Sequence, residues 1–213
     1  MSAQDRAEVL LETTEGNIRL ALYNETPRHR DNFLNLVQNQ FYDSLLFHRV
    51  IRNFMIQAGD PLSRHAEPGK ELGDGDLYYT LEPEFRLPGI YHRRGVLAAA
   101  REDDEHNPGR RSSACQFYIV WGKTFSSKDI ENMQIRLDTL TNGQVKLTPE
   151  QIQTYRFKGG TPHLDGQYTV FGEVVEGMDV VEKIMRKDTD DNDRPVWDVR
   201  ILRATVTKPF GNF

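Results

Sequence analysis

The sequence predicts a mainly β fold, a barrel or a sandwich. Apolar and β-branched residues recur in many short runs, and only a few segments have the spacing of a helix. Glycine, proline and aspartate separate these runs, as they do at turns between strands. The chain has 213 residues, of which 38% are hydrophobic. A chain of this size buries enough surface to fold as one domain without a metal ion or a disulfide.

The first predicted element is a β-hairpin. Its arms, residues 9–12 and 17–23, are rich in apolar residues, and a turn ending in glycine separates them. In the second arm Ile18, Leu20 and Leu22 occupy alternate positions. Because side chains alternate between the two faces of a strand, these three residues share one face.

An amphipathic helix is predicted to follow the hairpin. Thr26 has the side chain of an N-cap, and Pro27 suits the first helical position. Phe33, Leu36 and Val37 then follow at the i, i+3 and i+4 spacing. This spacing places all three on one face of the helix, which we expect to be buried.

The β pattern continues along the rest of the chain. The predicted strands are residues 47–51, 54–58, 95–100, 116–121, 168–175 and 196–206. A further helix after Gly177 is indicated by Met178, Val181 and Ile184, which share one helical face.

Residues 122–160 interrupt the β pattern and predict an inserted helical hairpin. Ser126 with Asp129, and Thr148 with Gln151, have the spacing of capping boxes at two helix starts. We expect the insertion to cap one end of the sheet, and a protein-docking role is the alternative. The apolar residues expected to be buried against the sheet are Ile130, Met133, Leu137, Ile152 and Tyr155.

Composition argues against several classes of protein. The 27 basic and 32 acidic residues give a net charge of −5, and no basic stripe is present, so nucleic acid is not an expected partner. No apolar run approaches the ~20 residues that span a bilayer. Cys115 has no disulfide partner in this chain, and we interpret it as a small residue preceding a strand.

No metal or cofactor site is expected. The six histidines show no metal-ligand spacing. The acidic run 188–193 lacks the glycine and the glutamate of a calcium loop and is interpreted as a solvated turn. The fingerprints of hydrolases and nucleotide-binding enzymes are also missing from the sequence.

A dense constellation of residues lies in the segment 47–60. In the alternating frame of a strand, Arg49 points opposite to His48, whereas Met55 and Gln57 share a face. A permanent cation, an amide and apolar side chains together suit the binding of a peptide. The alternative is a pair of ordinary core strands from which Arg49 reaches water.

The spacing of this segment favours a specific site. Phe-His-Arg, four residues, then Phe-Met-x-Gln-x-Gly-Asp resembles the signature of the cyclophilins, which are peptidyl-prolyl isomerases. Blocks at 95–100, 113–119 and 164–172 agree with the same family in the same order. The resemblance covers about residues 9–206 without the insertion. It implies a closed eight-stranded antiparallel barrel capped by two helices, with the peptide lying across the outer face, in a single domain of residues 1–213.

The resemblance also implies roles for individual residues. Arg49 matches the catalytic arginine, and the walls of the proline pocket match Phe54, Met55, Tyr118 and Leu164. Tyr118 stands where the family usually has phenylalanine.

Further positions match the residues that bind the substrate outside the pocket. Gln57 and Gln116 match polar groups around the substrate backbone. Ala100 and Arg101 match the strand that pairs with the substrate; Arg101 replaces the usual asparagine, so we expect the groove to gain charge.

Two replacements affect the expected ligand range. His163 stands where cyclosporin-sensitive members carry tryptophan, and Tyr168 replaces the common histidine. Weak cyclosporin binding is therefore expected, with the isomerase role less affected. Because the insertion enters between Tyr118 and Leu164, it should lie near the groove and restrict the substrates that fit.

The resulting functional prediction is a peptidyl-prolyl cis-trans isomerase that acts on proline-containing polypeptides and assists their folding. The alternative is a binding module of the same fold that turns over poorly. We expect a monomer without a cofactor. A cytoplasmic location is expected, or a periplasmic or lipid-anchored one if a leader was removed.

Overall fold

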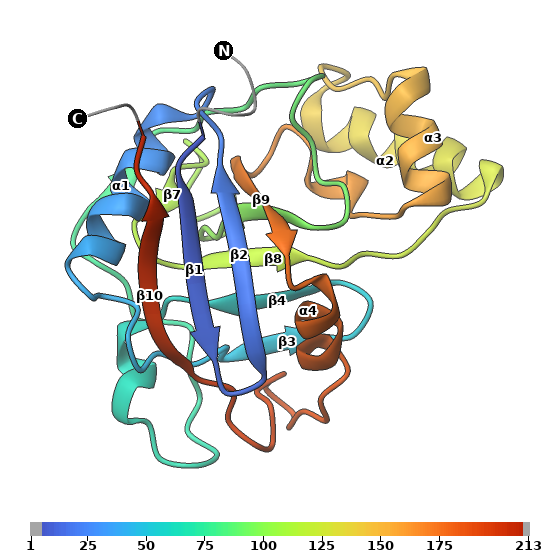
Figure 1. Cartoon of the computed structure of the whole chain (residues 1–213). Helices are drawn as coiled ribbons and strands as arrows, with labels where there is room; N and C mark the ends of the chain where they lie inside the picture. Colours follow the sequence, from blue (N-terminus) through green and yellow to red (C-terminus); the bar gives the residue numbers. More distant parts are fainter. Residues whose placement is uncertain (1–5, 211–213) are drawn as a thin grey trace.

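The computed structural model describes residues 6–210 and has a mainly β architecture (Figure 1). One antiparallel sheet of eight strands has the order β10-β1-β2-β9-β6-β8-β4-β3. Its strands are β1 (Glu8–Thr13), β2 (Gly16–Leu22), β3 (Arg49–Ile51), β4 (Met55–Ala58), β6 (Val96–Ala99), β8 (Phe117–Val120), β9 (Val170–Glu176) and β10 (Ile201–Lys208). The predicted strands are confirmed, although 196–200 precede β10 rather than belonging to it.

The sheet curls into a half-barrel whose edges are β10 and β3, and the chain before β3 joins these edges. Phe47 donates its N–H to the carbonyl oxygen of Val199 at 2.8 Å, and Ile201 donates to Leu45 at 2.8 Å. These bonds close the ring through an irregular segment instead of a regular ladder. The expected eight-stranded fold is therefore confirmed.

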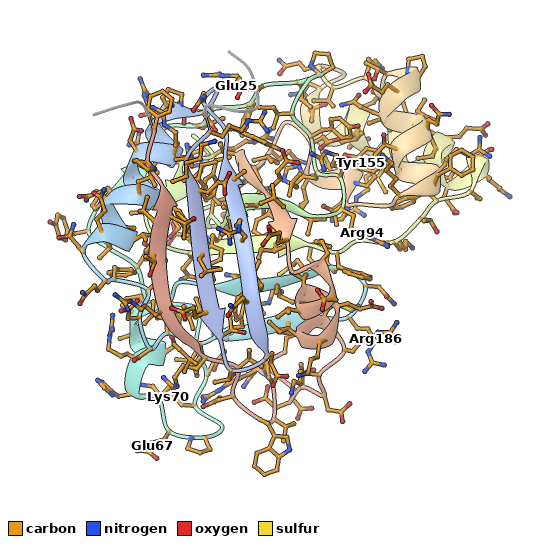
Figure 2. All side chains as sticks on the ribbon, in the orientation of Figure 1. Glu25, Glu67, Lys70, Arg94, Tyr155 and Arg186 are labelled. Atoms are coloured by element: carbon orange, nitrogen blue, oxygen red, sulfur yellow. The ribbon has the colours of Figure 1, made fainter. Side chains whose placement is uncertain are left out.

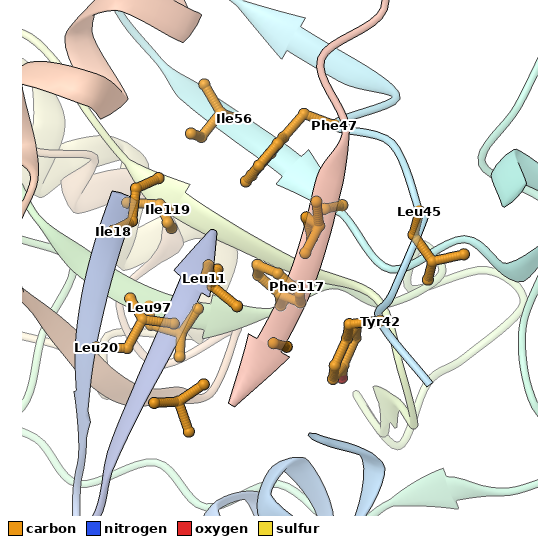
Figure 3. Close-up of a cluster of buried hydrophobic side chains, with 14 of the residues drawn as sticks. Leu11, Ile18, Leu20, Tyr42, Leu45, Phe47, Ile56, Leu97, Phe117 and Ile119 are labelled. Carbon is orange, nitrogen blue, oxygen red and sulfur yellow. The ribbon is translucent and has the colours of Figure 1, made fainter. Parts of the chain in front are cut away.

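The interior of the curled sheet holds the main hydrophobic core (Figure 3). Strand β8 shows how the core is filled. Phe117 and Ile119 belong to the interior cluster, whereas Tyr118 and Val120 belong to a second buried cluster on the other face. The period of two thus separates the barrel core from an outer face that is also largely buried.

Two helices cover the interior core. Helix α1 (Pro27–Gln38) packs against β9 and β10, and α4 (Met178–Met185) packs against β2, β3 and β4. The side chains that these helices contribute to the interior cluster are Phe33, Leu36, Val37, Val181, Ile184 and Met185. The prediction of two capping helices is confirmed.

The insertion forms helices α2 (Ser127–Thr141) and α3 (Pro149–Phe157), which lie beside the barrel (Figure 1). Both predicted capping boxes are present. Phe125, Ile130 and Tyr155 form a buried cluster of their own, with Met133 and Ile152 packed against it. The expectation that the insertion packs directly on the sheet is wrong, because its apolar residues mainly meet each other and nearby loops.

The two ends of the insertion meet at a tight neck. Gly122 has φ +67°, and a Cβ atom at this position would lie 2.3 Å from the carbonyl oxygen of Gly160. A Cβ atom at Gly160 would lie equally close to the carbonyl oxygen of His92. Glycine is therefore required at both positions, and the neck holds the insertion firmly against the barrel.

Three short elements complete the structure. Strands β5 (Thr80–Leu81) and β7 (Ser112–Ser113) form a small separate sheet that was not predicted. The 3-10 helices are η2 (Pro61–His65) and η3 (Pro162–Leu164). Within the described residues, no helix has the length and apolarity needed to cross a membrane.

Candidate active site

A row of paired residues crosses the outer face of the sheet. Arg49 of β3 pairs with Gln57 of β4, Gln57 pairs with Tyr118 of β8, and Tyr118 pairs with Ala98 of β6. Directly paired residues project from the same face. His48 is buried on the other side of this alternation, with 2% of its surface exposed. The predicted opposition of His48 and Arg49 is thus seen in the structure.

Arg49 has a half-exposed guanidinium beside an acidic turn. Its Nε lies 3.5 Å from Oδ2 of Asp193. The main chain fixes this approach, because Val50 donates its N–H to the carbonyl oxygen of Asp193 at 2.8 Å. Among residues 6–210, no hydrogen-bond partner approaches the two terminal nitrogens of Arg49. These donors are therefore free to meet a ligand.

An apolar cluster adjoins this row on the outer face. Met55 and Tyr118 are buried in it, with 2% and 4% of their surface exposed. Half-buried Phe54, Leu164 and Tyr168 pack against the same outer cluster. The structure thus brings together the residues that were predicted for a proline pocket.

Aromatic contacts join the half-buried residues beside this cluster. His163 stacks on Phe54 with ring centroids 5.5 Å apart, and Tyr168 meets Tyr118 edge-on at 6.1 Å. Burial lowers the pKa of His163 to about 4, and the nearby charge of Arg136 on α2 acts in the same direction. His163 is therefore a neutral aromatic wall at neutral pH.

The hydroxyl group of Tyr118 has a buried partner. It lies 2.9 Å from Nε2 of His92, and Nδ1 of His92 lies 3.0 Å from the carboxyl group of Asp165. Burial holds the pKa of Tyr118 well above its ordinary value, so the phenol stays protonated. Tyr118 thus keeps an apolar ring within the outer cluster and a satisfied hydroxyl group behind it.

Two amide side chains connect the row to a loop. Gln57 donates from Nε2 to Oε1 of Gln116 at 2.9 Å. Gln116 in turn donates to the carbonyl oxygens of Gly73 and Gly75 at 2.7 and 2.6 Å. These bonds fix both amides at the edge of a cavity of about 610 Å³, which Ala100 and Arg101 also line.

The expectation that Arg101 adds charge to the groove is wrong. Its side chain is only 4% exposed and pairs with Asp104 at 2.6 Å. The guanidinium lies over the ring of Tyr168 at 4.4 Å and donates to the carbonyl oxygen of Gln167 at 2.8 Å. The charge is thus neutralised and covered, and the side chain supports the pocket wall from behind.

The main-chain N–H and carbonyl groups are hydrogen-bonded at Ala100 but not at Arg101, among the residues that the structure describes. Ala100 donates to the carbonyl oxygen of Gln116 at 3.0 Å and accepts from the N–H of Ser113 at 2.9 Å. No main-chain hydrogen bond within the described part of the chain uses the N–H or carbonyl group of Arg101. The main-chain donor and acceptor of Arg101 are therefore both unpaired among residues 6–210.

Sequence reasoning missed His92, Asp165 and Asp193. A signal existed for the first two, because a tyrosine at a buried pocket position requires a hydrogen-bond partner. That signal does not say which residue supplies the partner. Cys115, by contrast, is a buried residue just before β8, as expected, and burial raises the pKa of its thiol.

The arrangement contains a guanidinium with free donors, two fixed amides and an apolar cluster on the outside of a β half-barrel. It suits the binding of a peptide, as the resemblance to the cyclophilins implies.

Comparison with known proteins gives the family. Residues 8–206 match the family model described as cyclophilin type peptidyl-prolyl cis-trans isomerase/CLD. A putative peptidyl-prolyl cis-trans isomerase of Staphylococcus aureus (strain COL) is 34% identical over 206 residues, covering 95% of this chain and 93% of that protein. The chain therefore belongs to the cyclophilin-type family and is a peptidyl-prolyl cis-trans isomerase that acts on proline-containing peptides.

Two other similarities extend this finding. Peptidyl-prolyl cis-trans isomerase CYP71 of Arabidopsis thaliana is 35% identical over 202 residues, which cover 94% of this chain but 24% of that longer protein. The fold is similar to a crystal structure of a cyclophilin-type isomerase from Cryptosporidium parvum. That similarity has a TM-score of 0.66 at 21% identity and covers 96% of this chain and 99% of the other.

Proposed function

We propose that Arg49 is the catalytic residue and that the neighbouring pocket holds the proline ring of the substrate. The observation that carries this assignment is the shared row on the outer face. The half-exposed guanidinium of Arg49 has free terminal donors. Arg49 is paired with Gln57 on the neighbouring strand, and Gln57 is paired with Tyr118 on the strand after that.

The chemistry follows from the electronic structure of the X-Pro bond. Rotation crosses a barrier of about 20 kcal/mol, because amide resonance is lost. As the bond twists, the proline nitrogen becomes pyramidal and regains a lone pair. A donor aimed at that nitrogen binds the twisted state more strongly than the planar one and so accelerates rotation. Arginine suits this role because it stays protonated at physiological pH.

The apolar pocket supplies a second contribution. A charge-assisted hydrogen bond stabilises by about 1.5–3 kcal/mol, which is only about one to two decades of rate. Phe54, Met55, Tyr118 and Leu164 would hold the ring while the preceding carbonyl group swings. Water excluded from this pocket no longer stabilises the planar, more dipolar amide.

The substrate backbone is proposed to lie along the free main-chain groups of Arg101. Gln57 and Gln116 would contact it from the other side, with Ala100 lining the same cavity. His163 and Tyr168 would close the pocket. The substrates would be proline-containing chains during folding.

Exchange spectroscopy on a short Ala-Pro peptide tests the proposal. We expect the wild-type protein to accelerate cis-trans exchange, and the Arg49→Ala variant to lose most of this acceleration while still binding the peptide. Wild-type protein that binds without accelerating exchange would identify a binding module. The choice of peptide is supported by a crystal structure of the Cryptosporidium parvum cyclophilin-type isomerase in the presence of the dipeptide Ala-Pro.

Weak cyclosporin binding is proposed as well. The imidazole of His163 stacks on Phe54 where an indole would offer a larger apolar surface and a hydrogen-bond donor. The His163→Trp variant should therefore bind cyclosporin more tightly than the wild type in a calorimetric titration, and equal affinities would contradict this assignment.

The chain is further proposed to act as a single-domain, cytoplasmic monomer. The tight packing of its neck on the barrel supports including the insertion 122–160 in that domain. Light scattering at several protein concentrations would test the monomer, with a mass that rises with concentration as the contrary result.

A further inference from the structure

Four buried polar side chains join the inserted helices to the floor of the proline pocket. Tyr155 of α3 lies 2.6 Å from Oδ2 of Asp165. Oδ1 of Asp165 lies 3.0 Å from Nδ1 of His92, whose Nε2 lies 2.9 Å from the hydroxyl group of Tyr118. We name this chain of contacts the buried relay. Figure 2 labels Tyr155 at the junction of the insertion and the barrel.

The direction of each hydrogen bond in the buried relay follows from its partners. Asp165 accepts from the hydroxyl group of Tyr155 and, through Oδ1, from the main-chain N–H of His92 at 2.8 Å. Nδ1 of His92 therefore carries the proton that points at Asp165, which leaves Nε2 to accept from the hydroxyl group of Tyr118. Burial holds the pKa of Tyr155 well above its usual value, so this hydroxyl group remains a donor.

The relay is built as a unit and is isolated from solvent. Tyr155 and Asp165 have 0% of their surface exposed, His92 has 1% and Tyr118 has 4%. Removing one donor from such a network leaves a buried polar atom without a partner, and the remaining members shift to recover one. These hydrogen bonds therefore give a continuous buried connection from α3 to Tyr118.

The neck of the insertion reinforces this connection. Thr161 donates its N–H to the carbonyl oxygen of His92 at 2.8 Å, and Arg94 donates to the carbonyl oxygen of Gly159 at 3.0 Å. A Cβ atom at Gly160 would lie 2.7 Å from the ring of Tyr155. The insertion and the residue that supports the pocket floor therefore form one packed block.

We propose that Tyr155 is a positioning residue for the isomerase site and that the insertion sets the affinity of the proline pocket through the buried relay. This inference rests on the proposed role of Tyr118 in that pocket. With the relay intact, the hydroxyl group of Tyr118 is satisfied behind the pocket, and the ring presents a dry apolar floor. With the relay broken, the hydroxyl group shifts toward another partner, and the floor fits the proline ring less closely.

The expected effect is a change in KM. The pocket floor at Tyr118 holds the ring in the ground state and in the twisted state alike, whereas the exclusion of water from the amide depends on the pocket as a whole. Loss of this uniform binding at the floor changes KM without changing kcat. Coupling through a buried network is of the order of a fivefold effect. Tyr155→Phe should raise KM for an Ala-Pro peptide about fivefold with kcat within about twofold, measured where the variant is fully folded.

Tyr91→Phe is the matched control. The hydroxyl group of Tyr91 also joins the barrel to α3, through Oγ1 of Thr154 at 3.0 Å, and its ring meets that of Tyr155 edge-on at 5.6 Å. This variant removes one interface hydrogen bond but no member of the buried relay. Its KM should equal that of the wild type, and a rise equal to that of Tyr155→Phe would overturn the proposal.

A double-mutant cycle distinguishes positioning from general structural support. In a Tyr118→Phe background the relay no longer ends in a hydroxyl group at the pocket, so adding Tyr155→Phe should leave KM unchanged. A fivefold rise in both backgrounds, or no rise in the wild-type background, contradicts the proposal. If Phe54→Ala also leaves KM unchanged, the pocket assignment itself has failed, whereas a normal Phe54→Ala effect confines the failure to the relay.

Nitrogen NMR of the wild-type protein tests the relay without any variant. The ring of His92 should carry a proton at Nδ1, with Nε2 showing the shift of an acceptor. Protonation at Nε2 would reverse the bond to Tyr118 and overturn the proposed connection.

Discussion

The two faces of β8 are almost equally buried, yet they have different roles. Phe117 on the inner face is 1% exposed, and Tyr118 on the outer face is 4% exposed. Phe117 meets Phe33 and Tyr42 edge-on, with ring centroids 5.4 Å away in both cases. Tyr118 instead places its hydroxyl group on His92 at 2.9 Å. Burial alone therefore does not mark the site; the hydrogen bonding of its polar groups does.

Removing the inner ring should give the largest effect, and it should appear in stability. Phe117→Ala leaves a cavity in the middle of the interior core, and such substitutions cost about 3–5 kcal/mol. Chemical denaturation at fixed pH measures the loss of unfolding free energy. Activity per folded molecule should stay near that of the wild type. A loss below about 1 kcal/mol would show that the interior repacks around the gap.

Removing the outer cation should give the next largest effect, and it should appear in the rate. Arg49→Ala is expected to lower kcat/KM more than tenfold, because it deletes the donor that favours the twisted amide. The free energy of unfolding should change by less than about 0.5 kcal/mol, because the side chain is half exposed.

Arg52→Ala serves as the control for Arg49. Arg52 lies three positions along the chain, is 62% exposed, and pairs with Asp188 at 3.9 Å. The Arg52→Ala variant removes the same charge from the same region, but Arg52 is not in the row of paired residues. The kcat/KM of this variant should therefore stay within about twofold of the wild-type value. Equal losses of kcat/KM in both variants would show that the positive charge of the region matters, and not a hydrogen-bond donor directed at the proline nitrogen.

The pocket wall should give a smaller effect, confined to binding. Phe54 is half buried, packs with the outer cluster and stacks on His163. Phe54→Ala removes apolar area worth about 1.5 kcal/mol of contact with the proline ring, so KM should rise about tenfold. Steady-state kinetics with an Ala-Pro peptide measures this change in KM. A fall in kcat with KM unchanged would instead place Phe54 in the chemical step.

The inner and outer faces of the sheet also differ in how far the sequence predicts their residues. The inner face follows from alternation, as Ile18, Leu20 and Leu22 show, because one local rule decides it. The residues of the outer pocket are implied by the resemblance to the cyclophilins that the segment 47–60 and three later blocks carry. Each block is itself a short stretch of neighbouring residues.

The contacts that complete the site are not local and escaped prediction. Tyr118 and His92 are 26 positions apart, and the buried relay closes only through the insertion. Arg101 is expected to add a positive charge to the groove, but its guanidinium forms an ion pair with Asp104 and stacks on the ring of Tyr168. Tertiary hydrogen bonds decide where such side chains point, and a single sequence does not state which partners meet.

The smallest predicted effect is a pH dependence that comes from the outer wall. His163 has a pKa of about 4 in the folded protein, against an ordinary value of 6.5. Between these values the unfolded chain binds a proton that the folded chain does not, so stability falls as pH drops from about 6.5 toward 4. At pH 5 the cost should be about 1 kcal/mol after allowance for solvent screening. His163→Gln should remove this part of the pH slope in denaturation curves at pH 7 and pH 5. Parallel slopes in the two proteins would mean that His163 keeps an ordinary pKa and that another group carries the acid sensitivity.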